Sequence, residues 1–92
     1  MTARSTLIRA LREALRSQAD TDKAAAMQAY MKSAMPYYGI QATEQRRTYR
    51  EIFARWPLST CTDWRDTVLR LWRTARYREE RYAAIELARY KR

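Results

Sequence analysis

The chain has 92 residues, which fits one domain with a modest core. It has no histidine and one cysteine, Cys61, which excludes an internal disulfide, a zinc site and histidine-based acid–base chemistry. We therefore expect no metal and no cofactor. No apolar run approaches the roughly 20 residues of a membrane span, and a cytoplasmic protein without a membrane partner is expected.

The net charge of +9 comes from sixteen arginines and three lysines against ten acidic residues. Residues 1–43 carry +3 (six basic minus three acidic), and residues 44–92 carry +6 (thirteen minus seven). A positive field of this size favours polyanionic partners such as nucleic acid. The alternative is that the arginines reflect genome base content and are merely solvated.

The first helical pattern covers residues 5–17. Leu7, Leu11 and Leu15 repeat at the spacing of one helical turn and predict a buried face, with arginines on the other side. The same residues superficially resemble an organelle transit peptide, since they are amphipathic and rich in arginine and serine. Glu13 within the pattern and the helix cap after it favour a structural helix.

A second helix is predicted after Asp20 or Thr21, since either residue can cap a helix N-terminus. Pro36 ends the helical pattern, and Gly39 can take a left-handed conformation in the turn. The apolar residues of this helix repeat at helical spacing and form one stripe, in which the methionines are expected to pack in the core: Met27, Tyr30, Met31 and Ala34.

The third helix is predicted from about Thr43, its expected cap, to Pro57. The fourth follows a polar loop and is expected to be capped by Thr62 or Asp63. Each has an apolar stripe that contributes to the core, and all three tryptophans are expected there. The stripes are Tyr49, Ile52, Phe53 and Trp56 in the third helix and Trp64, Val68, Leu71, Trp72 and Ala75 in the fourth.

The fifth helix is predicted from about Arg78 to the end of the chain. Its apolar face consists of small or aliphatic residues, namely Ala83, Ala84, Leu87 and Ala88. Tyr82 and Ile85 lie on the opposite side and predict that something covers them. That cover is either a continuation beyond Arg92 or a second copy that self-associates through this C-terminal helix.

Five helices joined by short loops predict an all-α fold of antiparallel helical hairpins. An up-down bundle and a helical-repeat array both fit this pattern. Five helices would make about two and a half repeats of a two-helix array, which usually needs three or more repeats for stability.

Two stretches resemble the AlkD-type DNA alkylation repair family. Residues 23–47, KAAAMQAYMKSAMPYYGIQATEQRR, resemble its N-terminal signature A-x-x-M-x-x-Y-M-K followed by G-I/V-x and T-P-x-R-R. Residues 69–92, LRLWRTARYREERYAAIELARYKR, resemble its segment L-W-x-x-x-x-R-E-x-x-x-A-A-I/L. The two stretches occur in the family's order, and the resemblance covers nearly all of the chain from Lys23 onward.

This resemblance implies a HEAT-like repeat array with a basic concave surface that binds alkylated duplex DNA. Its best-studied branch consists of DNA glycosylases that release alkylated purines by hydrolysing the N-glycosidic bond. Full-length members are much longer, and their catalytic aspartate belongs to later repeats. The single helical-repeat domain of residues 1–92 is therefore expected to be an N-terminal portion, inactive alone and without catalytic residues. The alternative is a non-enzymatic helical-repeat module that binds nucleic acid or a protein partner.

The resemblance also implies roles for individual residues. Tyr30 matches a tyrosine that faces the DNA-binding cleft, Lys32 the family's lysine, and Gln41 a glutamine that some members place beside the lesion. Core packing and exposure in the cleft remain equal alternatives for Tyr30. Ala42 and Thr43 depart from the family's T-P and leave the neighbouring DNA contacts less secure.

The third helix carries a basic edge. Arg46 and Arg50 are i, i+4 neighbours without an acidic partner on their own helix, and guanidinium groups suit phosphate contacts. Arg47 lies on the same flank, but Glu51 at i+4 can pair with it. The three arginines are thus candidate DNA-binding residues, and locally paired or solvated charge is the alternative.

The remaining reactive side chains are not expected to be catalytic. Glu79 and Glu80 are adjacent on what should be an exposed helical turn, where their side chains diverge among flanking arginines that keep them ionised. Cys61 lies in a polar loop and is expected to be incidental.

Overall fold

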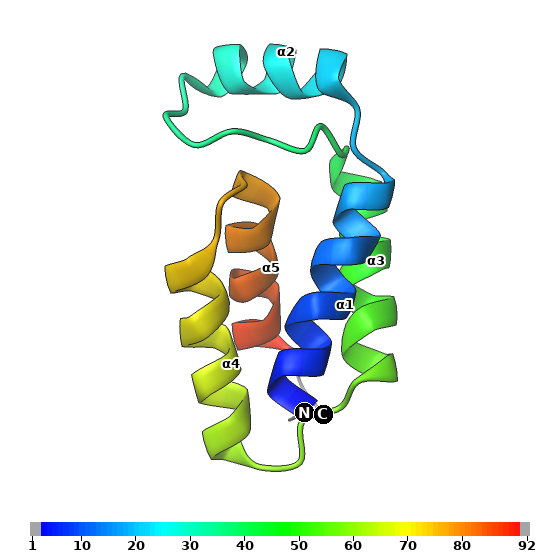
Figure 1. The fold of residues 1–92 in the computed structure, drawn as a ribbon, viewed down its shortest axis with the longest axis vertical. Helices are drawn as coiled ribbons and strands as arrows, with labels where there is room; N and C mark the ends of the chain where they lie inside the picture. The colour runs from blue at the N-terminus through cyan, green and yellow to red at the C-terminus, as the bar shows by residue number, and fades with distance from the viewer. Residues whose placement is uncertain (1–2, 91–92) are drawn as a thin grey trace.

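The computed structural model describes residues 3–90, and within them the fold is all-α, as predicted (Figure 1). No strand occurs in this part of the chain. The helices are α1 (Ala3–Ser17), α2 (Thr21–Met31), α3 (Ala42–Arg55), α4 (Cys61–Thr74) and α5 (Arg78–Arg89). None of these helices is long and apolar enough to span a bilayer. The expected helical residues beyond Tyr90 lie outside the described residues.

Four of the helices form two antiparallel hairpins stacked in two layers. α1 packs against α3 and α4, and α5 packs against α4 and α3. α1 and α4 run in one direction and α3 and α5 in the other (Figure 1). The hairpins are therefore α1–α3 and α4–α5, with α1 beside α4 in one layer and α3 beside α5 in the other. This arrangement is consistent with a helical-repeat array.

The second helix does not belong to either hairpin. α2 lies across one end of the other four (Figure 1), and none of its residues is buried. The prediction that its methionines pack in the core is therefore wrong. Their helical spacing is real, but no element covers that face. The five helices make two hairpins and one crossing helix instead of two and a half repeats.

The core lies between the two layers. Leu7, Leu11 and Leu15 are fully buried, so α1 is a structural helix, and each leucine contributes about 1.5–3 kcal/mol through burial. The predicted faces of α3 and α5 supply most of the opposite wall. The other buried core residues include Tyr49, Phe53, Leu58, Leu71, Ala83, Ala84 and Leu87. Ala88, assigned to the same face of α5, is exposed.

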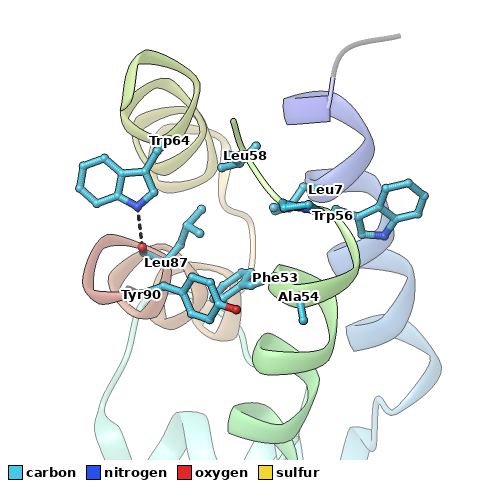
Figure 2. Close-up of a pocket in the computed structure, with 9 residues that line it drawn as sticks. Leu7, Phe53, Ala54, Trp56, Leu58, Trp64, Leu87 and Tyr90 are labelled. Carbon is cyan, nitrogen blue, oxygen red and sulfur yellow. Dashed lines mark hydrogen bonds between the residues drawn. The ribbon is translucent and has the colours of Figure 1, made fainter. Parts of the chain in front are cut away.

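The tryptophans divide between core and surface. Trp56 and Trp64 are partly buried against the core, and the Trp64 indole N–H donates to the Leu87 carbonyl at 2.8 Å (Figure 2). Trp72 is 41% exposed, so its predicted core position is wrong. Its ring instead carries the Arg81 guanidinium 4.5 Å from the centroid, a cation–π contact that suits a surface tryptophan.

The sequence predicted the N-cap of α2 correctly and misplaced that of α4. Asp20 caps α2 as expected, since its carboxylate accepts from the N–H groups of Asp22 and Lys23 at 3.1 Å. The cap of α4 is Thr60 and not Thr62 or Asp63 as predicted, and its hydroxyl accepts from the Asp63 N–H at 3.0 Å. This places Asp63 in the first turn, where the helix dipole favours an acid.

α3 begins at Ala42, with Gln41 at the N-cap and no side-chain cap, so Thr43 lies inside the first turn. The predicted start of α5 at Arg78 is confirmed.

Residues 37–40 of the segment between α2 and α3 are buried although they are not helical. Tyr37, Tyr38, Gly39 and Ile40 all lie inside the fold. Gly39 has a φ of +94°, which confirms the predicted left-handed turn, and an added Cβ would lie 2.1 Å from the Asp20 carbonyl oxygen. No other residue type fits this position without displacing the backbone of α2.

Two carboxylates hold this buried segment in place. Glu79 is fully buried and accepts from the backbone N–H groups of Tyr38, Gly39 and Ile40 at 2.9, 3.0 and 3.2 Å. Glu80 is also buried and accepts from the Tyr38 hydroxyl at 2.6 Å. Burial and this hydrogen bond raise the pKa of Tyr38 well above its usual range.

The prediction that Glu79 and Glu80 lie on an exposed turn is thus wrong. Their hydrogen-bond donors come from a loop some forty positions earlier in the chain. The sequence around the two glutamates therefore could not show that they are buried and paired.

Candidate nucleic-acid interface

The basic edge predicted on α3 forms one side of a groove. Arg46 and Arg50 are exposed and line a hollow of about 260 Å³ together with Arg89 of α5. Glu86 of α5 lines the same hollow, so three positive charges meet one negative charge. Neither Arg89 nor Glu86 could be singled out as a site residue from the pattern of α3, because both come from the neighbouring helix.

Buried aromatic side chains form the floor of this groove. Tyr49 and Phe53 line it from α3, with their rings stacked at 6.2 Å between centroids. The Tyr49 hydroxyl lies 2.9 Å from Gln45 Oε1 and 2.8 Å from the Glu79 carbonyl oxygen. Burial raises the pKa of Tyr49 well above its usual range, so the hydroxyl keeps its proton and its bonds. The floor therefore fixes the α3 backbone that carries the arginines.

A second, apolar hollow continues along the same two helices toward α2. Its volume is about 440 Å³, and α2, the following loop, α3 and α5 all contribute to its lining. The lining side chains include Met27, Tyr30, Met31, Tyr37, Gln45 and Tyr82. Tyr30 is 86% exposed, which decides between its two alternatives in favour of the surface.

The two hollows make one continuous surface. On α3, Tyr49 in the basic hollow is one turn from Gln45 in the apolar one and donates to it, and on α5, Tyr82 and Glu86 are one turn apart. We call this surface the α3–α5 face and define it by the two sets of lining residues. It presents an apolar, aromatic end near α2 and a basic end farther along the helices.

Tyr82 anchors the apolar end. Its hydroxyl lies 3.1 Å from the Tyr37 hydroxyl, and the Arg78 guanidinium lies 5.6 Å from its ring centroid. Burial, followed by the hydrogen bond to Tyr82, raises the pKa of Tyr37 from 10.0 to about 12. Tyr82 is partly buried against the core, so the prediction that it points away from the core is wrong. Ile85 is 43% exposed, as that prediction requires.

The remaining predicted site residues lie around this face and not within it. Lys32 is exposed at the C-cap of α2, where it takes a left-handed conformation with a φ of 50°. Gln41 is exposed at the N-cap of α3. Arg47 is exposed on α3 and lines neither hollow. The structure thus brings together Tyr30 in one hollow and Arg46 with Arg50 in the next.

Other sites are less suited to a charged ligand. An apolar cavity of about 300 Å³ lies at the end of the helices away from α2 (Figure 2), lined by Leu7, Phe53, Trp56, Trp64, Leu87 and Tyr90 among others. No charged side chain lines it, and none of the predicted site residues reaches it. Cys61 is exposed at the start of α4. Across residues 3–90, no three cysteine, aspartate or glutamate side chains cluster closely enough to hold a metal ion.

The chain matches a known protein family. The model of a family described as DNA alkylation repair enzyme matches residues 11–92, from the middle of α1 through α5. The matched span includes both stretches whose residues resemble that family and all of the α3–α5 face. No curated protein matches the chain.

Proposed function

Because the chain belongs to the DNA alkylation repair enzyme family, we propose that it binds duplex DNA through the α3–α5 face. The observation that carries this proposal is the groove in which Arg46 and Arg50 of α3 meet Arg89 of α5. The sequence of α3 supplies two of these charges at one-turn spacing, and the packing of α5 beside α3 adds the third. The result is a row of guanidinium groups along a rigid wall.

Such a row suits the phosphate backbone of a duplex. A guanidinium fork donates two parallel hydrogen bonds to one phosphate, and phosphate contacts position a protein without reading sequence. Glu86 offsets part of the charge, so binding by this chain alone should be weak and sensitive to salt. Tyr30 and Met31 at the other end offer apolar surface for sugars or base edges.

For the chemistry, we propose that alkylated purines are released by N-glycosidic hydrolysis, as the family resemblance implies. The reaction needs a carboxylate and aromatic faces that stabilise positive charge developing on the sugar. Glu79 and Glu80 are unsuited because loop donors already occupy their oxygens inside the fold. We therefore assign a binding role to the α3–α5 face and no catalytic residue to residues 3–90.

The binding proposal is tested with a charge-matched pair of double variants. Arg46→Ala/Arg50→Ala should weaken duplex binding by roughly tenfold or more and lower the slope of log affinity against log salt by about 2. Arg65→Ala/Arg73→Ala removes the same charge from exposed positions of α4 outside the α3–α5 face. Gel shifts at several salt concentrations measure both. Equal losses in the two variants would show that net charge, and not this face, determines binding.

The chemical part has its own test. Base release is measured from duplex DNA carrying alkylated purines, with the 92-residue chain as the enzyme. We expect binding without release. Release by this chain would contradict the assignment of a binding role alone and would direct the search to Glu86, the carboxylate that lines the groove.

A second candidate function, a non-enzymatic module that associates with protein, rests on the outer side of the α4–α5 hairpin. Leu69 and Trp72 of α4 and Ile85 of α5 are exposed there. Trp72 contacts Arg81. Because α4 and α5 are antiparallel, Leu69, one turn before Trp72, is expected near Ile85, one turn after Arg81. We propose that this apolar stripe pairs two copies of the chain. Light scattering should show a dimer that Trp72→Glu disrupts, and a monomer at all concentrations would exclude it.

A further inference from the structure

Another groove runs along the layer formed by α1 and α4, and of the residues of the α3–α5 face only Tyr37 lines it as well. It consists of two hollows of about 590 and 270 Å³ that follow each other along α1, because Arg12 and Arg16 line both. The larger hollow is closed by the turn between α4 and α5 and by the start of α2. We call these two hollows together the α1–α4 groove.

This groove is strongly basic. Five arginines from α1, α4 and the turn after α4 line it: Arg9, Arg12, Arg16, Arg70 and Arg76. Only two acidic side chains, Glu13 and Glu80, share it, which leaves a charge of +3 (five minus two). The proposed DNA-binding face uses none of these residues, so their concentration along one groove calls for another anionic ligand.

Arg12 is held in place within the groove. Its Nε donates to Glu80 Oε1 at 3.1 Å, and its Nη2 donates to the hydroxyl and the carbonyl oxygen of Thr74 at 2.7 and 3.2 Å. Glu80 is fixed in turn by the Tyr38 hydroxyl. These bonds leave the Nη1 amine of the guanidinium for an anion, and the fork needs little reordering to bind one.

The larger hollow also has an aromatic wall. The rings of Tyr38 and Tyr77 are stacked, with centroids 4.0 Å apart and planes inclined by 18°. Tyr38 is buried, whereas Tyr77 is only partly buried, and both line the hollow. A partly open tyrosine beside the fixed guanidinium group of Arg12 is a combination that suits a base and its phosphate.

We infer that the α1–α4 groove binds a nucleoside phosphate, with the base against Tyr77 and the phosphate on Arg12, Arg16 and Arg76. The hollow of about 590 Å³ has the size of a small-ligand site, which is roughly 300–1,000 Å³. The base must be unpaired, because a duplex keeps its bases stacked inside. The ligand is thus a free nucleotide or one unit of a single strand whose next phosphates reach Arg9 and Arg70.

The test uses thymidine monophosphate and a fluorescein-labelled oligothymidylate as probes. The parent chain should bind both, and Arg16→Ala/Arg76→Ala should weaken both by roughly tenfold or more. Both side chains are exposed, so the variant should fold, and circular dichroism checks that it does. Arg46→Ala/Arg50→Ala, on the opposite layer, is the matched control and should bind the mononucleotide like the parent.

A second pair of changes separates the two sources of the ligand. Arg9→Ala/Arg70→Ala should weaken the oligonucleotide alone if a strand follows the groove, and should leave both affinities unchanged if the ligand is a free nucleotide. Either result supports the site. It is overturned if neither probe binds, or if Arg16→Ala/Arg76→Ala binds both probes as tightly as the parent.

Amide chemical shifts measured by NMR test the location of the site independently of affinity. Thymidine monophosphate should shift signals of residues 12–16 and 74–77 and leave those of residues 46–50 in place. Shifts centred on α3 would overturn the site even if binding is tight. Because duplex binding is measured separately on Arg46→Ala/Arg50→Ala, failure of this inference leaves the proposed function standing, and the reverse also holds.

Discussion

α2 and the segment that follows it differ in an unusual way: the helix is exposed and part of the loop is buried. α2 has no buried residue, whereas residues 37–40 are buried and have no regular structure. Loops ordinarily stay at the surface because their backbone N–H groups need water. Here the Glu79 carboxylate takes the place of water for three successive N–H groups. Burial thus follows the supply of hydrogen-bond partners more closely than it follows regular structure.

The largest expected effect comes from removing that carboxylate. Glu79→Ala leaves three buried N–H groups without an acceptor and should lower the free energy of unfolding by about 3 kcal/mol or more. Urea denaturation measures this loss. Glu86→Ala, on the same helix but away from the loop, should cost about 1 kcal/mol or less. Similar losses for the two variants would mean that the loop does not depend on Glu79.

The next largest effect is expected at the single glycine. Gly39→Ala adds a methyl group 2.1 Å from the Asp20 carbonyl oxygen at a φ of +94°, so the loop or α2 must move. We expect a loss of about 2–3 kcal/mol in urea denaturation. An unchanged midpoint would show that α2 shifts freely on the helices below it.

A smaller effect is expected where α2 begins. Asp20→Ala removes the cap that accepts from Asp22 and Lys23, and should cost about 1 kcal/mol. Asp20→Asn keeps an acceptor and should cost less. In Asp20→Ala, hydrogen exchange should accelerate more in α2 than in α1 or α3, because no buried side chain holds α2. Equal acceleration in all three helices would mean that α2 and the core unfold together.

At neutral pH the hydroxyl of Tyr37 adds no pH dependence, because it is protonated in both the folded and the unfolded chain. Its pKa is raised from 10.0 to about 12 in the folded chain, so the folded state binds this proton more tightly. The stabilisation is complete below pH 10 and is lost as the pH rises toward about 12. Urea denaturation across this range should show a steeper decline for the parent than for Tyr37→Phe. Parallel declines would contradict a role for Tyr37.

The smallest effect on stability is expected at the exposed end of α2. Tyr30→Ala should change the free energy of unfolding by less than about 0.5 kcal/mol, because the ring is 86% exposed. The same change should weaken duplex DNA binding if the apolar end of the α3–α5 face contacts DNA. A loss of stability without a loss of binding would reverse the assignment of Tyr30 to the surface.

The success of the sequence predictions depended on where each partner came from. The leucine spacing of α1 and the aromatic spacing of α3 correctly predicted buried faces, because other helices cover those faces. The stripe of α2 has the same spacing but no covering element, so the same rule failed there. Periodicity shows which side chains could be buried together and does not show what lies opposite them.

Prediction of the candidate site was limited in the same way, by residues that other helices contribute. Arg46 and Arg50 could be singled out from α3 alone, because their i, i+4 spacing places them on one flank. Arg89 could not, since it reaches the groove only through the packing of α5 beside α3. Glu79 was misassigned for the same reason. Adjacent glutamates among arginines suggest a solvated turn when the sequence is considered alone. Only the three-dimensional structure shows the loop that they bind.

The insertion of α2 also bears on the order in which the chain folds. The α4–α5 hairpin closes across residues 75–77, whereas the α1–α3 hairpin must close across residues 18–41. Closing a longer loop costs more chain entropy, so we expect α4 and α5 to dock first. The start of α5 would then be ready when the segment around Gly39 arrives. Pulse-labelled hydrogen exchange should protect α4 and α5 before α1, and simultaneous protection would count against this order.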